Sequence, residues 1–371
     1  MTSSERHRRL VDTIGLLQVP GIGGGRFDRL DRAFGSAGAA SAASIAELAA
    51  VPGISRALAT AIHEQYDEAS AEATAGQIAQ LGWAVIFPDD ADYPPMLSAL
   101  EPPPPLLFRV GEPAHASDRM IAIVGTRHPT ERGRMFAHGL ARALAESGIA
   151  VVSGMAEGID TAAHTGALDG GGRTVAVWGS SLDQVYPPTN RGLADRIRER
   201  GAIYSEYLPG TFPDRPHFPE RNRIISGMAW GVVVVEAGDR SGALITAEHA
   251  LRQNRTVFAV PGPPGATASL GCNELLKQGA GLVTSVEDIF RELPTLRGEV
   301  KVQRAAERPD LTPTEREIVA LFTAGPVQLD DLARRLNKPV AELTQFLLAL
   351  ELKGVVLELA GKRFTLSDEF A

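Results

Sequence analysis

Between residues 119 and 293, short apolar segments alternate with amphipathic segments that have helical spacing. The apolar segments lie at 120–125, 149–154, 174–179, 202–207, 231–238, 256–262 and 281–285. Apolar runs without polar alternation are typical of strands that are buried on both faces of a parallel sheet. Amphipathic segments such as RMFAHGLARALAESG would supply the helices that cover it. The pattern therefore predicts an α/β fold with a Rossmann-like, doubly wound, mostly parallel sheet.

The first 80 residues have a helical pattern that contains a near-repeat. VPGIGGGR at 19–26 and VPGISRAL at 51–58 each indicate a helix end, a glycine-containing hairpin and a new helix start. This resembles the helix-hairpin-helix element of SAM-like domains, in which hairpin amides can bind a phosphate at a helix N-terminus. The alternative is a small helical bundle in which the hairpins only connect helices. Both interpretations stay open at this stage.

Three further regions complete the predicted organisation. Residues 81–118 form a proline-rich extension, stiff around EPPPP at 101–105, with short strands expected at 83–87 and 105–111 beside the α/β domain. Residues 294–310 are polar and indicate a linker. Residues 311–371 predict three helices and a hairpin with Gly361 at its tip, which is the outline of a winged helix. Winged helices bind duplex DNA or other proteins, but the third helix here has little basic character.

Composition narrows the class of protein. The net charge of −8 and the sequence pI of about 5.6 argue against general coating of duplex DNA, although a local basic groove remains compatible with them. Arginine supplies most of the positive charge and suits bidentate phosphate contacts, but a high-GC genome would give the same bias. The single cysteine, Cys272, excludes an internal disulfide and a thiolate metal cluster. The charged N-terminus and the lack of a long apolar run predict a cytoplasmic protein without a membrane segment.

Known catalytic motifs are missing from the sequence. It contains no G-x-G-x-x-G fingerprint after a strand, no Walker A loop, no G-x-S-x-G elbow and no H-E-x-x-H helix, so we predict no cofactor, no metal and no catalytic residue. SGMAEGIDTAAH at 153–164 brings Asp160 and His164 one helical turn apart. An acid–base pair is one interpretation; the favoured one is that Asp160 caps a helix and His164 is packed or exposed. The turn at Ser153 and Gly154 is a candidate phosphate contact.

Arginines and aromatic residues follow several of the predicted strands. Because the carboxyl ends of parallel strands share one edge of a sheet, these loops should meet there. Arginines can hold a phosphate backbone while an aromatic ring stacks on an unpaired base, so the pattern predicts a site for single-stranded nucleic acid. Alternatively, Arg221 and Arg223 pair with Glu220 and Glu236, and Phe218 belongs to the core. The candidate binding residues are Arg127, Arg191, Arg215, Phe218, Arg221 and Arg223, together with Ser153 and Gly154.

The α/β segment resembles the DNA-processing protein A (DprA, also called Smf) family. The resemblance is carried, in order, by SGMAEGIDTAAHTGAL, YPPTN, SEY, FPERNRIISG, VVVVEAGDRSGALITAEHAL and VFAVPG. It implies a non-enzymatic protein of natural transformation (competence) and DNA recombination. Such a protein binds and protects incoming single-stranded DNA, forms a homodimer through the Rossmann-like domain and loads a RecA-type recombinase.

The same resemblance implies roles for individual residues. Arg127 matches a DNA-contacting arginine, Phe218 a base-stacking aromatic residue, and Arg221 and Arg223 a basic pair. Arg215 stands where other members have a lysine. A second departure is Pro188, which stands where many members have a basic residue directly after the Tyr-Pro pair. The nearby Arg191 could supply the contact of that basic residue. The resemblance assigns no dimer residues, and contact of the winged helix with duplex DNA stays open.

Two other classes remain as alternatives. EAGDRSGALITAE is similar to the phosphate-binding loop of nucleotide-monophosphate phosphoribohydrolases, in which Glu248 could be the acid. Against that class, the loop spacing differs and the arginine-rich loops would have no role. A scaffold that binds only proteins is the third interpretation.

Overall fold

The computed structural model describes residues 2–114, 118–297, 311–322, 327–336, 338–353, 355–359 and 362–366. The chain divides into two compact units, Met1–Arg297 and Gly298–Ala371, and each is considered by itself. Most of the predicted linker, residues 298–310, and the predicted hairpin tip at Gly361 lie outside the described residues.

The first unit is built on a nine-stranded sheet with the order β1-β2-β6-β5-β4-β3-β7-β8-β9. Neighbouring strands from β3 to β9 are parallel, whereas β1 and β2 are antiparallel and close one edge. The predicted Rossmann-like sheet is therefore confirmed, including the two short strands at its edge. The strands are β1 (Ala84–Ile86), β2 (Leu107–Gly111), β3 (Met120–Val124), β4 (Ala150–Ser153), β5 (Thr174–Val177), β6 (Ala202–Ser205), β7 (Gly231–Val234), β8 (Thr256–Ala259) and β9 (Gly281–Leu282).

The strand order reverses between β3 and β7. From β3 the chain adds β4, β5 and β6 on one side, and it then returns to add β7, β8 and β9 on the other. In such sheets the loops after the two central strands separate and leave a crevice at the carboxyl end, which is the usual ligand position. This topology places the loop after β3 beside the loop after β7.

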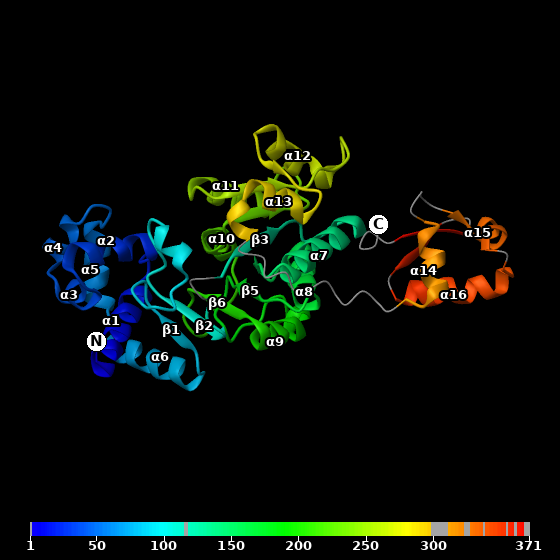
Figure 1. Ribbon diagram of the computed structural model, residues 1–371. Coiled ribbons are helices and arrows are strands. Elements are labelled where there is room, and N and C mark those ends of the chain that lie inside the picture. Colours follow the sequence, from blue (N-terminus) through cyan, green and yellow to red (C-terminus); the bar gives the residue numbers. More distant parts are fainter. Residues whose placement is uncertain are drawn as a thin grey trace. The chain divides into compact units, whose positions relative to one another are not determined.

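Helices cover both faces of the sheet (Figure 1). One apolar cluster joins the sheet to α10, α11, α12 and the short 3-10 helix η1, and another joins it to α7, α8 and α13. The α9 helix packs against β5 and β6. The bounds of these helices are α7 (Glu131–Glu146), α8 (Ile159–Asp169), α9 (Arg191–Arg200), α10 (His217–Met228), α11 (Gly242–Arg252), α12 (Leu270–Lys277), α13 (Val286–Glu292) and η1 (Pro95–Ala99).

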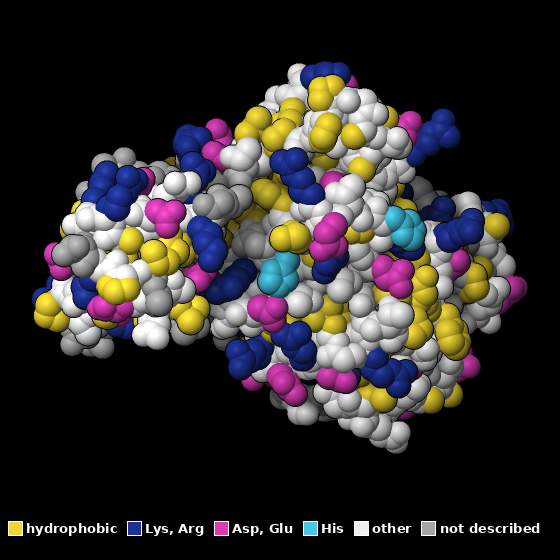
Figure 2. All heavy atoms as spheres, turned by 90° about the vertical axis from the view of Figure 1, so that its right-hand side faces the viewer, with side chains coloured by type: hydrophobic (Ala, Val, Ile, Leu, Met, Phe, Trp, Pro, Cys, Tyr) yellow, Lys and Arg dark blue, Asp and Glu magenta, His cyan; other side chains and the backbone are white. Residues whose placement is uncertain are grey.

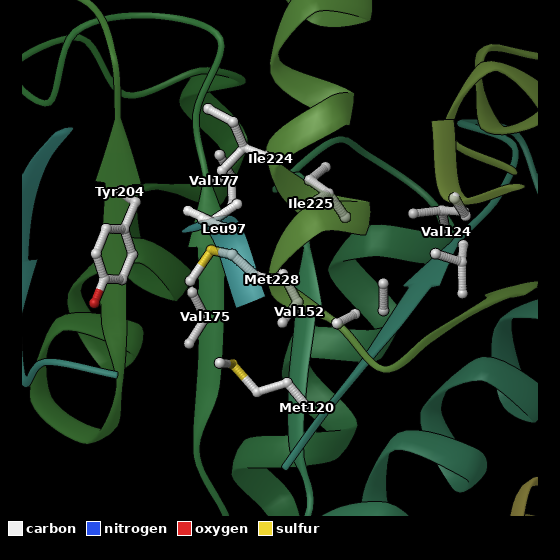
Figure 3. Packing of buried hydrophobic residues seen from close by; sticks show 14 of the residues in the cluster. Leu97, Met120, Val124, Val152, Val175, Val177, Tyr204, Ile224, Ile225 and Met228 are labelled. Atoms are coloured by element: carbon white, nitrogen blue, oxygen red, sulfur yellow. The ribbon is translucent and has the colours of Figure 1, made fainter. Parts of the chain in front are cut away.

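Apolar packing holds α10 in place. Its Ile224, Ile225 and Met228 lie against Val152 and Val175 in a fully buried cluster (Figure 3). Burial of three large apolar side chains is worth roughly 1.5–3 kcal/mol for each, so the position of the helix is strongly determined. The first turn of α10, which carries Phe218, is thereby held beside the central strands.

The N-terminal helices have a core of their own and also cover the β1–β2 edge. Leu16, Leu30, Leu48 and Ile62 are fully buried in the helical core. α1 and α6 pack with β1 and β2 in a separate cluster. The helices are α1 (Ser3–Gln18), α2 (Gly24–Phe34), α3 (Ala37–Ala42), α4 (Ile45–Ala50), α5 (Arg56–Gln65) and α6 (Glu68–Gln80).

The second unit has the predicted winged-helix architecture, and its described residues form three helices and a three-stranded sheet of order β10-β12-β11. The third helix, α16, contains no lysine or arginine, and its described surface includes Thr344, Gln345 and the 56 % exposed Leu348. Lys362 and Arg363 are exposed beside the β11–β12 turn. The elements are α14 (Pro313–Ala320), β10 (Val327–Gln328), α15 (Leu329–Leu336), α16 (Val340–Leu352), β11 (Val356–Leu359) and β12 (Arg363–Leu366). Across the described ranges, no helix is both long and apolar enough to cross a bilayer.

Candidate nucleic-acid interface

Two adjoining cavities open at the reversal of strand order. Their volumes are about 310 and 220 Å³, and Arg127, Phe218 and Arg221 line both of them. The larger cavity also reaches the start of α11 at Ser241, and the smaller one reaches Tyr186. The crevice that this fold usually offers to ligands is therefore lined by the loops after β3, β4 and β5, by α10 and by the start of α11.

An arginine and two rings meet at this crevice, and we refer to Arg127, Tyr186 and Phe218 as the Arg127–Phe218 cluster. The Cζ atom of Arg127 lies 5.1 Å from the centroid of the Phe218 ring. The Tyr186 and Phe218 centroids are 5.7 Å apart with an interplanar angle of 36°. Phe218 is half-buried, while Arg127 and Tyr186 are exposed. The Phe218 ring is thus neither a core side chain nor freely mobile, and part of it faces solvent.

The loop after β3 is held by Glu236, which follows β7. The backbone N–H of Thr130 donates to Glu236 Oε2 at 2.8 Å, and the Thr130 hydroxyl donates to Oε1 at 2.6 Å. Gly158 closes the loop from the other side, with a φ of +83°. A Cβ atom there would collide with the Thr126 carbonyl oxygen, so only glycine allows this approach. Arg127 therefore projects from a constrained loop, and Glu236 is not the partner of Arg221 or Arg223.

Arg221 lies almost entirely inside the protein, with 4 % of its surface exposed. Its Nη1 donates to the carbonyl of Gly154 at 2.6 Å and to the carbonyl of Val177. Burial lowers the pKa of Arg221 to about 10, while the charge of the neighbouring Asp160 acts in the opposite direction. The guanidinium therefore joins the ends of β4 and β5, and only part of the residue borders the crevice.

Ser153 and Gly154 are also buried. The Ser153 hydroxyl donates to the Ile123 carbonyl at 2.7 Å, and the Gly154 N–H donates to Asp160 at 3.1 Å. A Cβ atom at Gly154 would lie 2.6 Å from an Arg221 Nη atom, so this glycine makes room for the guanidinium. The polar groups of this turn are used within the protein, which indicates that the two residues position Arg221.

The capping prediction for Asp160 was wrong in its detail. Helix α8 begins at Ile159 after the N-cap residue Gly158, and the Asp160 carboxylate accepts from the N–H groups of Gly154 and Ala156 in the preceding loop. Burial raises the pKa of Asp160, although Arg221 and these donors lower it. Asp160 has a structural role, as the sequence favoured, but it organises the loop before the helix rather than the first turn.

His164 is completely buried and makes one hydrogen bond, between Nδ1 and Thr174 Oγ1, at 2.7 Å. The Thr174 hydroxyl donates its proton to the Val151 carbonyl, so His164 Nδ1 must be the donor in this contact. Burial lowers the pKa of His164 to about 3, and the nearby Arg221 acts in the same direction. His164 is a neutral core residue.

This environment predicts a specific pH dependence of stability. Below its ordinary pKa of 6.5, His164 gains a proton in the unfolded chain but not in the folded protein until the pH approaches about 3. As the pH is lowered from 6.5 towards about 3, the free energy of unfolding should therefore fall by up to about 1.4 kcal/mol per pH unit. Urea denaturation of wild type and His164→Asn at several pH values would measure the difference in slope. His128→Asn, at an exposed position, is the matched control and should keep the wild-type slope.

The other residues that the sequence predicted to bind DNA lie outside the Arg127–Phe218 cluster. Arg223 pairs with Glu206 and lines a separate cavity beside the N-terminal hairpin. Arg191, at the start of α9, and Arg215, in the loop before α10, are exposed and line neither cavity of the crevice. Pro188 lines the smaller one. The structure thus brings together Arg127, Phe218 and Tyr186, and it leaves Arg191 and Arg215 on the flanking surface.

The charged surface is mixed. Figure 2 shows one face of the molecule, where lysine and arginine side chains are interspersed with carboxylates rather than gathered into one basic surface. This agrees with the net charge of −8 and indicates a local site. No group of three or more potential metal ligands occurs among the described residues.

Two residues that support the site, Asn190 and Tyr207, were not predicted to do so from the sequence. Asn190 donates to the Met155 carbonyl and to the Thr161 hydroxyl, both at 2.9 Å, and so joins the loop after β5 to the loop after β4. Tyr207 stacks on His217 with centroids 4.3 Å apart. Asn190 lies within YPPTN and Tyr207 within SEY, so their segments were recognised but their roles as supports were not.

Fold and site define a class: a doubly wound α/β protein with an arginine–aromatic surface at its topological switch point. Residues 84–294 match the sequence model of the family described as DNA recombination-mediator protein A, and residues 302–362 match the DprA winged helix domain. The chain belongs to the DNA recombination-mediator protein A family.

Curated relatives agree with this assignment. Protein Smf of Synechocystis is 36 % identical over 314 residues, which are 75 % of this chain and 79 % of the relative. The DNA processing protein DprA of Bacillus subtilis is 43 % identical over 203 residues, or 54 % of this chain and 68 % of the relative.

Solved structures are similar as well. The crystal structure of DNA processing protein A from Streptococcus pneumoniae has a TM-score of 0.67 and 35 % identity, and it covers 76 % of this chain and 97 % of that one. DNA processing protein A from Helicobacter pylori, described for its single-stranded DNA binding mode, has a TM-score of 0.51 and 29 % identity. Its match covers 57 % of this chain and 96 % of that one.

Proposed function

We propose that this protein binds single-stranded DNA at the Arg127–Phe218 cluster and that it acts without catalysing a reaction. The observation that carries the proposal is the half-buried Phe218 ring between Arg127 and Tyr186 at the switch point. Stacking on such a ring requires an unpaired base, because a duplex hides the faces of its bases. The binding mode described for the Helicobacter pylori relative supports the same class of ligand.

The residues have different parts in this proposal. Arg127, Arg191 and Arg215 are exposed cations that can contact phosphates, and Phe218 supplies the stacking surface. Arg221, Ser153 and Gly154 hold the ends of β4 and β5 in place beneath the ring. Arg223 forms an ion pair with Glu206 and is therefore not a free cation for a phosphate.

The salt dependence of binding tests this assignment. Each phosphate neutralised on a single strand contributes about −0.7 to the slope of log affinity against log salt, so three exposed arginines predict a slope of about −2. Arg127→Ala should reduce the slope by about 0.7 and weaken binding to all sequences equally, because phosphate contacts carry no sequence information. Fluorescence anisotropy with labelled oligonucleotides would measure both quantities.

Arg132→Ala is the control, since Arg132 is exposed nearby but lines neither cavity of the crevice. It should leave the slope unchanged. An affinity that is independent of salt, or an Arg127→Ala effect confined to particular sequences, would contradict the proposal.

The wider role follows the family resemblance. We propose that the protein protects incoming single-stranded DNA in natural transformation, transfers it to a RecA-type recombinase and works as a homodimer. Leu251 and Leu282, 57 % and 52 % exposed, line one cavity beside the edge strand β9. An apolar sheet edge is a suitable surface for a second copy. Helix α16 has no lysine or arginine and carries the exposed Glu351, which favours a protein partner over duplex DNA for that helix.

The phosphoribohydrolase alternative has less support. Its predicted acid, Glu248, is exposed, pairs with Arg252 and does not line the crevice. Incubation with nucleoside monophosphates should release no free base. Robust release of free base would mean that the primary function is catalysis and not DNA binding.

A further inference from the structure

A larger cavity, of about 730 Å³, separates the first N-terminal hairpin from the loop after β6. The hairpin residues Gly21–Gly25 form one wall, and Tyr207 with the outer side of α10 forms the other. Pro102 and Pro105 of the proline-rich segment also line it. Both walls belong to the same compact unit. The cavity is therefore a feature of the folded unit and is distinct from the crevice at the switch point.

Positive charge is in excess around this cavity. Arg26 and Arg29 of α2 donate to the carbonyls of Gly21 and Pro52, at 2.7 and 3.4 Å. Neither of these two arginines pairs with a carboxylate within the described part of the chain. On the opposite wall, Arg223 pairs with Glu206, and Glu220 accepts from the Tyr207 hydroxyl at 3.3 Å. Three guanidinium groups thus face two carboxylates, and because Arg223 and Glu206 neutralise each other, Arg26 and Arg29 outnumber the remaining carboxylate, Glu220.

Gly21 has a φ of +91° and therefore needs to be glycine, but the three glycines that follow Ile22 are not required by the fold of the protein itself. Gly23, Gly24 and Gly25 do not adopt positive φ. A Cβ atom at Gly23 would meet nothing within 4 Å, and at Gly24 and Gly25 the nearest atoms would be 3.6 and 3.8 Å away. Gly23 is the N-cap of α2, a position where glycine is among the favoured residues, and Gly24 and Gly25 are the first two residues of the helix. At Gly24 and Gly25 the packing of the protein would therefore accept a side chain.

What these glycines provide is access to the backbone. No side chain caps the start of α2, and the N–H groups of Gly24 and Gly25 have no acceptor among the described residues. The second hairpin differs, since the Ser55 hydroxyl caps Leu58 N–H at 3.2 Å. The uncovered amides of the first hairpin lie on the cavity wall together with Arg26 and Arg29. Amides and guanidinium groups in this combination suit a phosphate.

Helix α10 connects this cavity to the Arg127–Phe218 cluster. Phe218 and Arg221 line the crevice, whereas Glu220 and Arg223 line the hairpin cavity. Phe218 and Arg223 are five residues apart, which corresponds to about 7.5 Å along a helix axis. A strand stacked on Phe218 can therefore reach the hairpin cavity by passing the first two turns of α10.

We infer that the hairpin cavity holds the phosphodiester backbone of the same single strand, adjacent to the segment at Phe218. The N–H groups of Gly24 and Gly25 and the guanidinium groups of Arg26 and Arg29 are the donors. This inference rests on the proposed function and extends the binding surface from the Rossmann-like sheet to the N-terminal helices.

Oligonucleotide length tests the inference. Because single-strand grooves hold roughly 4–16 nucleotides, oligothymidylates of about 6 and about 20 nucleotides would occupy the Phe218 site alone or both sites. Arg26→Ala in the full-length protein should weaken binding of the longer strand on the order of tenfold. It should leave the affinity for the shorter strand unchanged. Gly24→Ala with Gly25→Ala should act in the same direction while the thermal midpoint stays equal or rises.

Two controls separate this effect from a general one. Arg32→Ala removes an exposed cation of α2 that does not line the cavity, and Gly76→Ala replaces a helical glycine with open surroundings in α6. Neither should change the affinity for either strand. Wild-type affinity of both cavity variants for the longer strand would overturn the inference, as would equal losses for both lengths. Failure of the proposed function looks different: the wild-type protein would then not bind the shorter strand.

Discussion

Replacing Phe218 with alanine is expected to weaken the binding of single-stranded DNA by about 1–3 kcal/mol, the usual contribution of one stacked base. The ring is half-buried and is supported by Tyr186 and Arg127, so it offers a preorganised surface that alanine cannot replace. Anisotropy titration of the shorter oligothymidylate would measure the change without a contribution from the hairpin cavity.

Phe212 provides a matched control. It lies in the loop before α10, is 70 % exposed and lines none of the cavities at the switch point. Phe212→Ala should therefore retain wild-type affinity. If Phe218→Ala keeps its fold and binds as the wild type does, the ring is part of the packing and not a stacking surface.

Replacing Arg221 with methionine should lower the free energy of unfolding by roughly 3–5 kcal/mol, because it leaves the buried Asp160 carboxylate without its cationic neighbour. The Gly154 and Val177 carbonyls would also lose their donor. Urea denaturation would measure the loss. A direct DNA contact predicts the reverse pattern, in which stability hardly changes while affinity falls.

A double variant makes this prediction more specific. Asp160→Asn combined with Arg221→Met removes both charges, so the pair should be less destabilised than the sum of the two single variants. Additive losses would mean that the two side chains act independently, and the structural role assigned to their electrostatic interaction would then be wrong.

The burial of Arg221 could have been predicted from helical spacing. Arg221, Ile224, Ile225 and Met228 recur at the intervals that place side chains on one face of a helix, and the last three are plainly apolar. Once FPERNRIISGM is read as a helix, Arg221 must share the inward face. Phe218 also lies on that side, but at the first turn, where the helix emerges from the core.

Other contacts carried no signal of this kind. Arg223 and Glu206 are 17 residues apart, and Thr130 and Glu236 are 106 apart. Which carboxylate accepts from which donor depended on the order of strands and on where the loops meet. The alternative that Arg221 and Arg223 pair with Glu220 and Glu236, inferred from charge alone, was therefore wrong.

The sequence by itself determined the doubly wound sheet and the winged helix, and it placed Arg127 and Phe218 after strands that end at one edge. Local periodicity is enough for those conclusions, because buried strands and amphipathic helices each leave a pattern within a few residues. Only the tertiary structure decided that Arg221 joins the ends of β4 and β5 and that the glycine hairpin and Arg223 line the same cavity. These outcomes depend on desolvation and on the docking of distant segments, which no short stretch of sequence records.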